Sequence, residues 1–450
     1  MFRIGLFDHP VAAQPGAFGA NVSTAAHVAL ARTVSEAGTV LLKNQDGLLP
    51  ITGSGKTIAV IGQPAGPAGA ENEYNGVGSG HVPEFGDIPV VSPEQGITQR
   101  AAANGDAVVY ADDTATVNAV AAAKAASLAV VFAGDSESEG IDRPNLTLTG
   151  GLCELTTCTP QPYDQNALIS AVAEANPNTV VVLNTGGPVL MPWQSSIKGL
   201  FEAWYPGQED GNAIAALLFG DVDPSARLTE MFPASQGDIP EQSPAQWPGV
   251  SAPGDSVGPH SQYSEGLLVG YRWYDAKRIT PLFPFGFGLD YTSFRYSGMT
   301  LQATTAGGNL AQASIRVTNT GQRAGADVPQ MYIEDPASTG EPPRQLKGFS
   351  RVSLSPGQSA TVHLPLNARA LSWWNPSAHA WTVSRGCYTV AIGPNERDIA
   401  AQQTLAVNGA RCPGATAAIA IGSGSGTTAY RAAARRAGWP AHSSGRRGWA

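Results

Sequence analysis

Residues 128–134 read Leu-Ala-Val-Val-Phe-Ala-Gly, an apolar run without a charged side chain. Such a run is typical of a parallel strand that is buried because helices cover both faces of its sheet. Similar strand-like runs are 39–43, 58–62, 107–111, 179–184 and 199–204, and helix-like segments are 24–37, 115–126, 164–176 and 212–219. Their alternation predicts an α/β domain over residues 24–230, with a mostly parallel sheet sandwiched by helices.

The C-terminal half of the chain shows a different periodicity. From residue 296, apolar and polar residues alternate in short stretches separated by turn signals, which predicts an all-β sandwich of immunoglobulin or fibronectin type over 296–410. Residues 231–295 are rich in Pro, Gly and Ser, and we expect an irregular connection there. Beyond Cys412 the chain carries arginines but no acid, so 411–450 predicts a disordered basic tail.

The composition excludes several classes of protein. Of 450 residues, 42% are apolar and 14% charged, which indicates packed domains rather than a disordered chain. A net charge of −9 offers no basic surface for nucleic acid. No apolar run reaches the about 18 residues that a membrane span needs. We therefore expect neither nucleic acid nor membrane as a partner, and an acidic surface is compatible with a neutral substrate such as a sugar.

Four cysteines are present, and none of them lies in a cluster with zinc spacing. Cys153 and Cys158 lie in a loop-like stretch, Cys387 lies in a predicted strand, and Cys412 follows the last predicted strand. Two disulfides would fit a secreted protein, and four unpaired thiols are the alternative. We expect a secreted protein, although residues 1–7 do not form a secretory signal.

The strand at 128–134 is followed by the stretch that carries the chemistry, Asp135-Ser136-Glu137-Ser138-Glu139-Gly140-Ile141-Asp142-Arg143. Ligands of open α/β sheets bind beyond the carboxyl ends of the strands, and this stretch brings four acids and one arginine to that edge. A carboxyl shielded from water there has a raised pKa and can donate a proton. A solvated acidic loop and a cation site are the alternatives.

The segment 138–143 resembles the Glu-Gly-x-Asp-Arg segment of glycoside hydrolase family 3. In that family the Glu before the Gly is the general acid/base, and this role falls on Glu139. Glu137 is its nearest rival, because the two acids are close in the sequence. The resemblance implies a supporting role for Asp142 and Arg143 in shaping the loop.

Further segments resemble the same family in the same order along the chain. They are 36–44, 76–80, 204–209, 218–225, 281–289, 317–321 and 345–349. The resemblance implies a β-glucosidase with an α/β sandwich and a fibronectin type III-like domain, acting on a β-glucoside or oligosaccharide. It implies no metal and no organic cofactor. Trp204 and Tyr205 follow a strand end, where they can line the aglycone side.

Family 3 β-glucosidases are retaining enzymes whose nucleophile is an Asp on an N-terminal barrel, usually followed by Trp. This sequence contains no Asp-Trp pair, and residues 1–8 resemble the segment that follows the barrel. We therefore expect residues 1–23 to be a linker remnant, Asp8 not to be the nucleophile, and the chain alone to be inactive. A barrel on a separate chain is an expected partner.

Three other functions compete with this interpretation. A carbohydrate-binding or accessory protein would keep the fold without catalysis, and a β-xylosidase fragment would share the mechanism. The interpretation as a nucleotide-binding protein depends only on the Gly-rich segment 76–80. This segment lacks the lysine that follows the glycines of a P-loop. Trp193, Trp273, Tyr274, Trp373 and Trp374 can also stack on sugars, although most such aromatic residues pack in cores or at domain interfaces.

Overall fold

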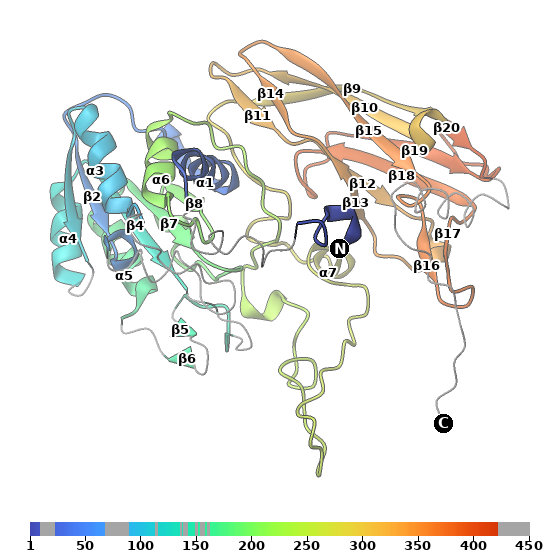
Figure 1. The fold of residues 1–450 in the computed structure, drawn as a ribbon, viewed down its shortest axis with the longest axis horizontal. Coiled ribbons are helices and arrows are strands. Elements are labelled where there is room, and N and C mark those ends of the chain that lie inside the picture. The colour runs from blue at the N-terminus through green and yellow to red at the C-terminus, as the bar shows by residue number, and fades with distance from the viewer. Residues whose placement is uncertain are drawn as a thin grey trace. The chain divides into compact units, whose positions relative to one another are not determined.

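A computed structural model describes residues 1–9, 23–67, 90–112, 116–135, 137, 143–148, 152–153, 158–159 and 163–421. The chain divides into two compact units, Met1–Ala226 and Arg227–Ala450 (Figure 1). Each unit is described by itself below.

The first unit is built on a six-stranded sheet with the order β1-β8-β7-β4-β2-β3. The strands are β1 Val40–Asn44, β2 Thr57–Ile61, β3 Ala107–Ala111, β4 Leu128–Gly134, β7 Thr179–Asn184 and β8 Gly199–Glu202. Only β1 runs antiparallel, to β8, and the other pairs are parallel. Every residue of β4 and β7 is buried, as continuous apolar strands require. The predicted α/β fold with a mostly parallel sheet is confirmed.

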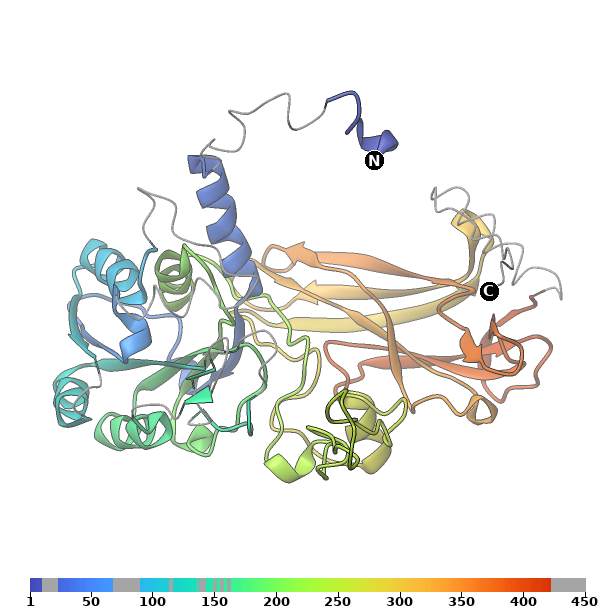
Figure 2. The same ribbon diagram turned by 60° about the horizontal axis from the view of Figure 1, so that its bottom comes forward.

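Helices cover both faces of this sheet (Figure 2). They are α1 Ala25–Gly38, α3 Pro93–Ala103, α4 Thr116–Ala125, α5 Gln165–Ala175 and α6 Asp210–Phe219. On one face α3 packs against α6, and on the other α4 packs against α5. A Cβ on Gly96 would lie 2.0 Å from the Gly211 carbonyl oxygen, so glycine is required where α3 and α6 meet. The carboxyl ends of β4, β7 and β8 remain at one edge between these layers.

The second unit is a β-sandwich (Figure 2). Its main sheets have the orders β15-β10-β9 and β13-β12-β18-β19-β20, and small pairs form from β11 with β14 and from β16 with β17. The strands are β9 Phe294–Ala303, β10 Asn309–Asn319, β11 Gly325–Asp327, β12 Gln330–Glu334, β13 Gln345–Phe349, β14 Val352–Leu354, β15 Ser359–Asn367, β16 Trp373–Asn375, β17 Ala380–Thr382, β18 Gly386–Gly393, β19 Ala401–Val407 and β20 Ala415–Ile419. Alternate residues of both main sheets, such as Ile315, Val317, Val390 and Leu405, form one core. The predicted sandwich is confirmed.

Two segments of the second unit differ from the sequence-based expectation. The range 231–295, expected to be irregular, contains the helix α7, Tyr271–Lys277, whose Tyr271 and Tyr274 are buried. The range 411–450, expected to be a disordered tail, contains β20, which pairs in parallel with β19 and buries Ile419 in the sandwich core. Its Ala-rich sequence lacks the alternation of bulky apolar and polar residues by which the other strands were predicted.

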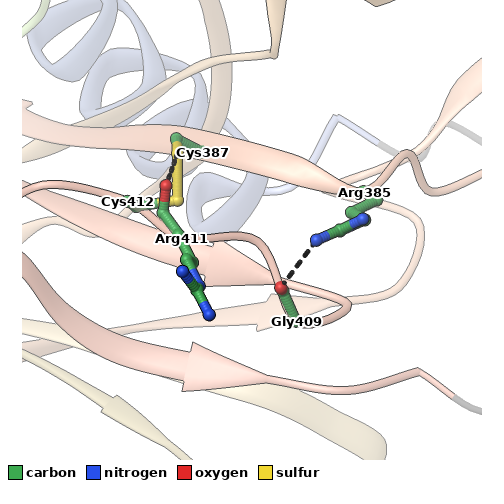
Figure 3. The surroundings of a disulfide bond; sticks show 5 residues. All are labelled: Arg385, Cys387, Gly409, Arg411 and Cys412. Atoms are coloured by element: carbon green, nitrogen blue, oxygen red, sulfur yellow. Dashed lines mark hydrogen bonds between the residues drawn. A yellow bond between two sulfur atoms is a disulfide. The ribbon is translucent and has the colours of Figure 1, made fainter.

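Cys387 on β18 and Cys412 form a disulfide, with Cα atoms 5.6 Å apart (Figure 3). Cys412 precedes β20, so the prediction that it follows the last strand was wrong. Nearby, the Arg385 guanidinium donates to the Gly409 carbonyl at 3.0 Å. The short strands β5 Leu152–Cys153 and β6 Cys158–Thr159 place Cys153 opposite Cys158, while the side chains of both lie outside the described part of the structure.

Replacing both Cys387 and Cys412 with Ala is expected to lower the free energy of unfolding by about 3 kcal/mol. The bond closes a loop with a sequence separation of 25, and removing it restores conformational entropy to the unfolded chain. Urea unfolding, followed by far-UV circular dichroism of the double variant and the parent, measures the difference. Equal midpoints would show that this bond contributes nothing.

Glu396 lies in the turn between β18 and β19, and its side chain is fully buried. Its Oε1 accepts a hydrogen bond from Arg397 Nε at 2.8 Å, while no donor among the described residues reaches Oε2. Burial raises the pKa of Glu396 to about 7; the charge of Asp275 adds to the rise, and Arg397 opposes it. A carboxylate in this place is therefore costly at neutral pH.

The stability of the second unit is expected to fall as pH rises from about 4.5 to about 7, because the folded state binds the Glu396 proton more tightly than the unfolded chain does. The contribution is at most about 3 kcal/mol. Glu396→Gln should flatten this fall in denaturant midpoints measured between pH 4.5 and 7.5. An equal slope in Glu396→Gln and the parent would show that the Glu396 carboxyl does not cause this fall.

Candidate active site

The candidate site lies at the carboxyl edge of the first unit's sheet, where β4, β7 and β8 are neighbours. Gln165 at the start of α5 fixes the end of β4. Its side-chain amide donates to the Gly134 carbonyl at 2.7 Å, and its Oε1 accepts from the Gly134 N–H at 2.9 Å. This buried amide takes the place of a neighbouring peptide group, so the chain leaves the sheet at Asp135 with its backbone groups satisfied.

Asp135 is the buried centre of the site, with 2% of its surface exposed. Its Oδ1 accepts hydrogen bonds from the Gly186 N–H at 3.1 Å and from the Tyr205 hydroxyl at 3.0 Å, while its Oδ2 pairs with Arg143. Burial raises the pKa of Asp135 above its ordinary value, and the Arg143 guanidinium works against that rise. Asp135 thus joins the loops that follow β4, β7 and β8.

Arg143 connects the two ends of the stretch 135–143. Besides Asp135, its guanidinium contacts Glu137 Oε1 at 2.8 Å and donates to the Pro188 carbonyl at 3.1 Å. The Arg143 side chain has 9% exposure, so these contacts form in a setting largely removed from water. The two ends of the acidic stretch are consequently held at the same place on the sheet edge.

Glu137 pairs with Arg143, and about a third of its side chain (34%) stays exposed to solvent. Its backbone N–H donates to the Tyr205 hydroxyl at 3.0 Å. A Cβ at position 186 would lie 2.4 Å from Glu137 Oε2 and 3.0 Å from the Tyr205 ring. Glycine at 186 is what allows the Glu137 carboxylate to reach this position.

Glu202 at the end of β8 is a second buried carboxyl, with no exposed surface. It accepts a hydrogen bond from the Thr185 hydroxyl at 3.1 Å and one from the Trp204 N–H at 2.8 Å. Burial raises the pKa of Glu202 well above its ordinary value. The contact with Trp204 supports a left-handed turn there (φ 57°), which ends β8 before the predicted residue 204.

The structure brings several of the predicted residues together. Arg143, its partner Glu137, and Tyr205 meet around Asp135, and Trp204 lies on the adjoining turn. The Tyr205 hydroxyl donates to Asp135 Oδ1 and accepts from the Glu137 N–H, so Tyr205 positions the site at least as much as it offers a sugar-stacking face. Glu139 and Asp142 lie outside the described residues, and the general acid/base assignment stays a prediction.

Sequence reasoning missed four residues that build this site: Gln165, Thr185, Gly186 and Glu202. The segment Thr185-Gly186-Gly187 directly follows a fully buried strand, and this small, polar sequence at a strand's carboxyl end was the available signal. Nothing in the sequence marks Gln165, because its role depends on how α5 packs beside β4. Trp193, which was considered for sugar stacking, is buried and donates to Asn166 Oδ1 at 2.8 Å.

Comparisons with known proteins agree on one family. Residues 39–291 match the model of the glycosyl hydrolase family 3 C-terminal domain, and residues 327–396 match that of the fibronectin type III-like domain. No helix in the described part of the chain is long and apolar enough to cross a membrane.

Individual relatives are similar over most of this chain. Thermostable β-glucosidase B of Acetivibrio thermocellus is 39% identical over 402 residues, which are 85% of this chain and 49% of that protein. An exo-α-(1→6)-L-arabinopyranosidase of Bifidobacterium breve is 34% identical over 85% of this chain and 49% of its own length. The solved structure of DesR, a β-glucosidase from Streptomyces venezuelae in complex with D-glucose, aligns with a TM-score of 0.74 at 31% identity, covering 84% of this chain and 59% of DesR. The chain spans about half the length of the curated relatives it matches.

Proposed function

Because this chain belongs to glycosyl hydrolase family 3, we propose that it is the portion of a retaining β-glucosidase that supplies the general acid/base, Glu139. The observation that carries the proposal is the Arg143 anchor. It joins Asp135 and Glu137 to the other end of the acidic stretch and engages Glu137 in an ion pair. Two carboxyls, Glu139 and Asp142, lie between these ends in the sequence, and the family resemblance assigns proton transfer to Glu139.

The proposed chemistry needs two carboxyls about 5–5.5 Å apart across the glycosidic bond. Glu139 gives its proton to the glycosidic oxygen as the C–O bond breaks, while a carboxylate from a barrel domain bonds to the anomeric carbon. Glu139 then takes a proton from water, which displaces the enzyme carboxylate and releases the sugar. Glu139 of this chain is the proton-donating carboxyl. We propose that the nucleophilic carboxyl comes from a barrel domain that binds this chain as a partner.

The sugar is proposed to be a terminal β-D-glucosyl residue, as the names of two of the relatives suggest. The arabinopyranosidase relative supports a pentoside as the second candidate. We also propose that the protein is secreted, and the Cys387–Cys412 bond supports this because disulfides persist in oxidising compartments.

The purified chain is expected to release no p-nitrophenol from p-nitrophenyl β-D-glucoside above the uncatalysed rate. Fused behind the half of the Acetivibrio thermocellus enzyme that it does not match, it should hydrolyse this substrate faster than the corresponding β-xyloside and α-L-arabinopyranoside. Circular dichroism of the fusion verifies its folding. If the chain alone hydrolysed the substrate and the Glu139→Gln variant of the chain did not, a barrel domain would not be needed. A folded but inactive fusion, together with tight glucose binding by the chain, would favour an accessory protein.

A further inference from the structure

The β16–β17 hairpin of the second unit (Figure 1) carries two exposed tryptophans, Trp374 and Trp381. Trp374 on β16 lies directly opposite Trp381 on β17, and their ring centroids are 5.4 Å apart. The exposed fractions are 44% and 41%. Trp373 on the other face behaves differently, because it is half-buried and its indole N–H donates to Ser384 Oγ at 2.9 Å. The short hairpin therefore holds two indole rings outward as a pair.

This pair is not explained by the packing of the sandwich. Single exposed aromatic side chains are common, whereas adjacent exposed rings form a contiguous apolar surface of the kind found at interaction sites. Of the three indole N–H groups on the hairpin, only that of Trp373 has a protein acceptor within the described residues. Trp374 and Trp381 therefore offer apolar ring surface together with donors, which suits a ligand with both C–H groups and acceptor oxygens.

Arg369 adds a third group to the surface. Its guanidinium carbon lies 3.0 Å from the centroid of the Trp381 ring, and its Nη1 donates to Ser372 Oγ at 3.3 Å. The guanidinium covers one face of Trp381 and fixes the ring's orientation. Trp374, over which no cation lies among the described residues, is the larger free stacking surface. A cationic ligand is disfavoured here by the charge of Arg369.

We propose that Trp374, Trp381 and Arg369 form a binding platform for a β-linked glucan chain. Pyranose rings of the gluco configuration carry their hydroxyls equatorially, so the axial C–H groups form apolar faces that stack on indole rings. The hydroxyl oxygens at the ring edges accept hydrogen bonds from indole and guanidinium N–H groups. This platform does not depend on Glu139 or on a barrel domain, and it lies entirely within the second unit.

The test is a titration of the full chain with cellohexaose, followed by tryptophan fluorescence and by calorimetry. Trp374→Ala and Trp381→Ala are each expected to weaken binding at least about tenfold, because truncating a central aromatic contact typically costs that much. Trp374→Phe keeps a ring and should lose less than about threefold. Trp247→Ala removes a similarly exposed tryptophan of the same unit (38%) and should leave binding unchanged.

Three outcomes would overturn the proposal. The first is an absence of cellohexaose binding by the parent chain. The second is binding of oligogalacturonate alone with a steep salt dependence, which would point to an anion site at Arg369. The third is a change of self-association in sedimentation for Trp374→Ala without any change in glucan binding, which would identify a protein contact. Activity of the catalytic fusion affects none of these readouts.

Discussion

Glu139→Gln in the active fusion is expected to reduce hydrolysis of cellobiose about 10³-fold, the usual scale of general acid–base catalysis. Cellobiose has a poor leaving group that must be protonated as the bond breaks. With 2,4-dinitrophenyl β-D-glucoside the first step needs no acid, so dinitrophenol should appear in a burst before the slow second step. Added azide should then restore turnover and yield β-glucosyl azide, because azide attacks without a general base.

Glu137→Gln is the matched control for this assignment. Its carboxylate contacts Arg143 at 2.8 Å, and the pair of Arg143 with Asp135 remains in the variant. We expect a loss of similar size for substrates with good and poor leaving groups, and no effect of azide. If azide rescued Glu137→Gln and not Glu139→Gln, the roles of the two acids would have to be exchanged.

Arg143→Ala is expected to destabilise the first unit by about 3–5 kcal/mol, because it leaves the Asp135 carboxylate buried without its cation. The Arg143 and Asp135 side chains are 9% and 1% exposed. Without the guanidinium the pKa of Asp135 rises further, so protonation relieves part of the loss. Urea midpoints should therefore differ more from the parent at pH 8 than at pH 5.

Arg100→Ala provides the comparison within the same unit. Arg100 pairs with a single carboxylate, that of Asp221, through two contacts of 2.6 and 2.9 Å. The side chains of this pair are 31% and 42% exposed, so its loss should cost no more than about 1 kcal/mol. Equal losses of unfolding free energy in the two variants would show that burial does not strengthen the Arg143–Asp135 pair.

The two folds could be predicted from the sequence because the residue patterns that indicate their strands lie within short segments. The buried strands Leu128–Gly134 and Thr179–Asn184 contain continuous apolar runs that are visible in the sequence, and the sandwich strands are recognised by alternation of apolar and polar residues. The strand β20 escaped because its sequence Ala-Thr-Ala-Ala-Ile lacks a distinctive pattern, and only its pairing with β19 makes it a strand.

The site followed from the sequence only where its residues are consecutive. The stretch 135–143 was found as a unit; Arg143 contacts Asp135 and Glu137, and its supporting role stays a prediction. Gln165 and Glu202 were not found, since their contacts join segments that are far apart in the chain. Such contacts depend on strand order, which residue patterns alone do not specify.

Fixing both ends of the stretch 135–143 to the scaffold has an evolutionary consequence. A segment whose ends are tied can change its composition or length at low cost, since doubling the length of a flexible loop costs only about 0.6 kcal/mol. If Glu139 and Asp142 keep their proposed roles, the other positions between 137 and 143 can diverge between descendants while Asp135, Arg143 and Tyr205 keep the frame intact. Under the proposed function, new sugar preferences can arise by substitution between the two anchored ends at little cost in folding free energy.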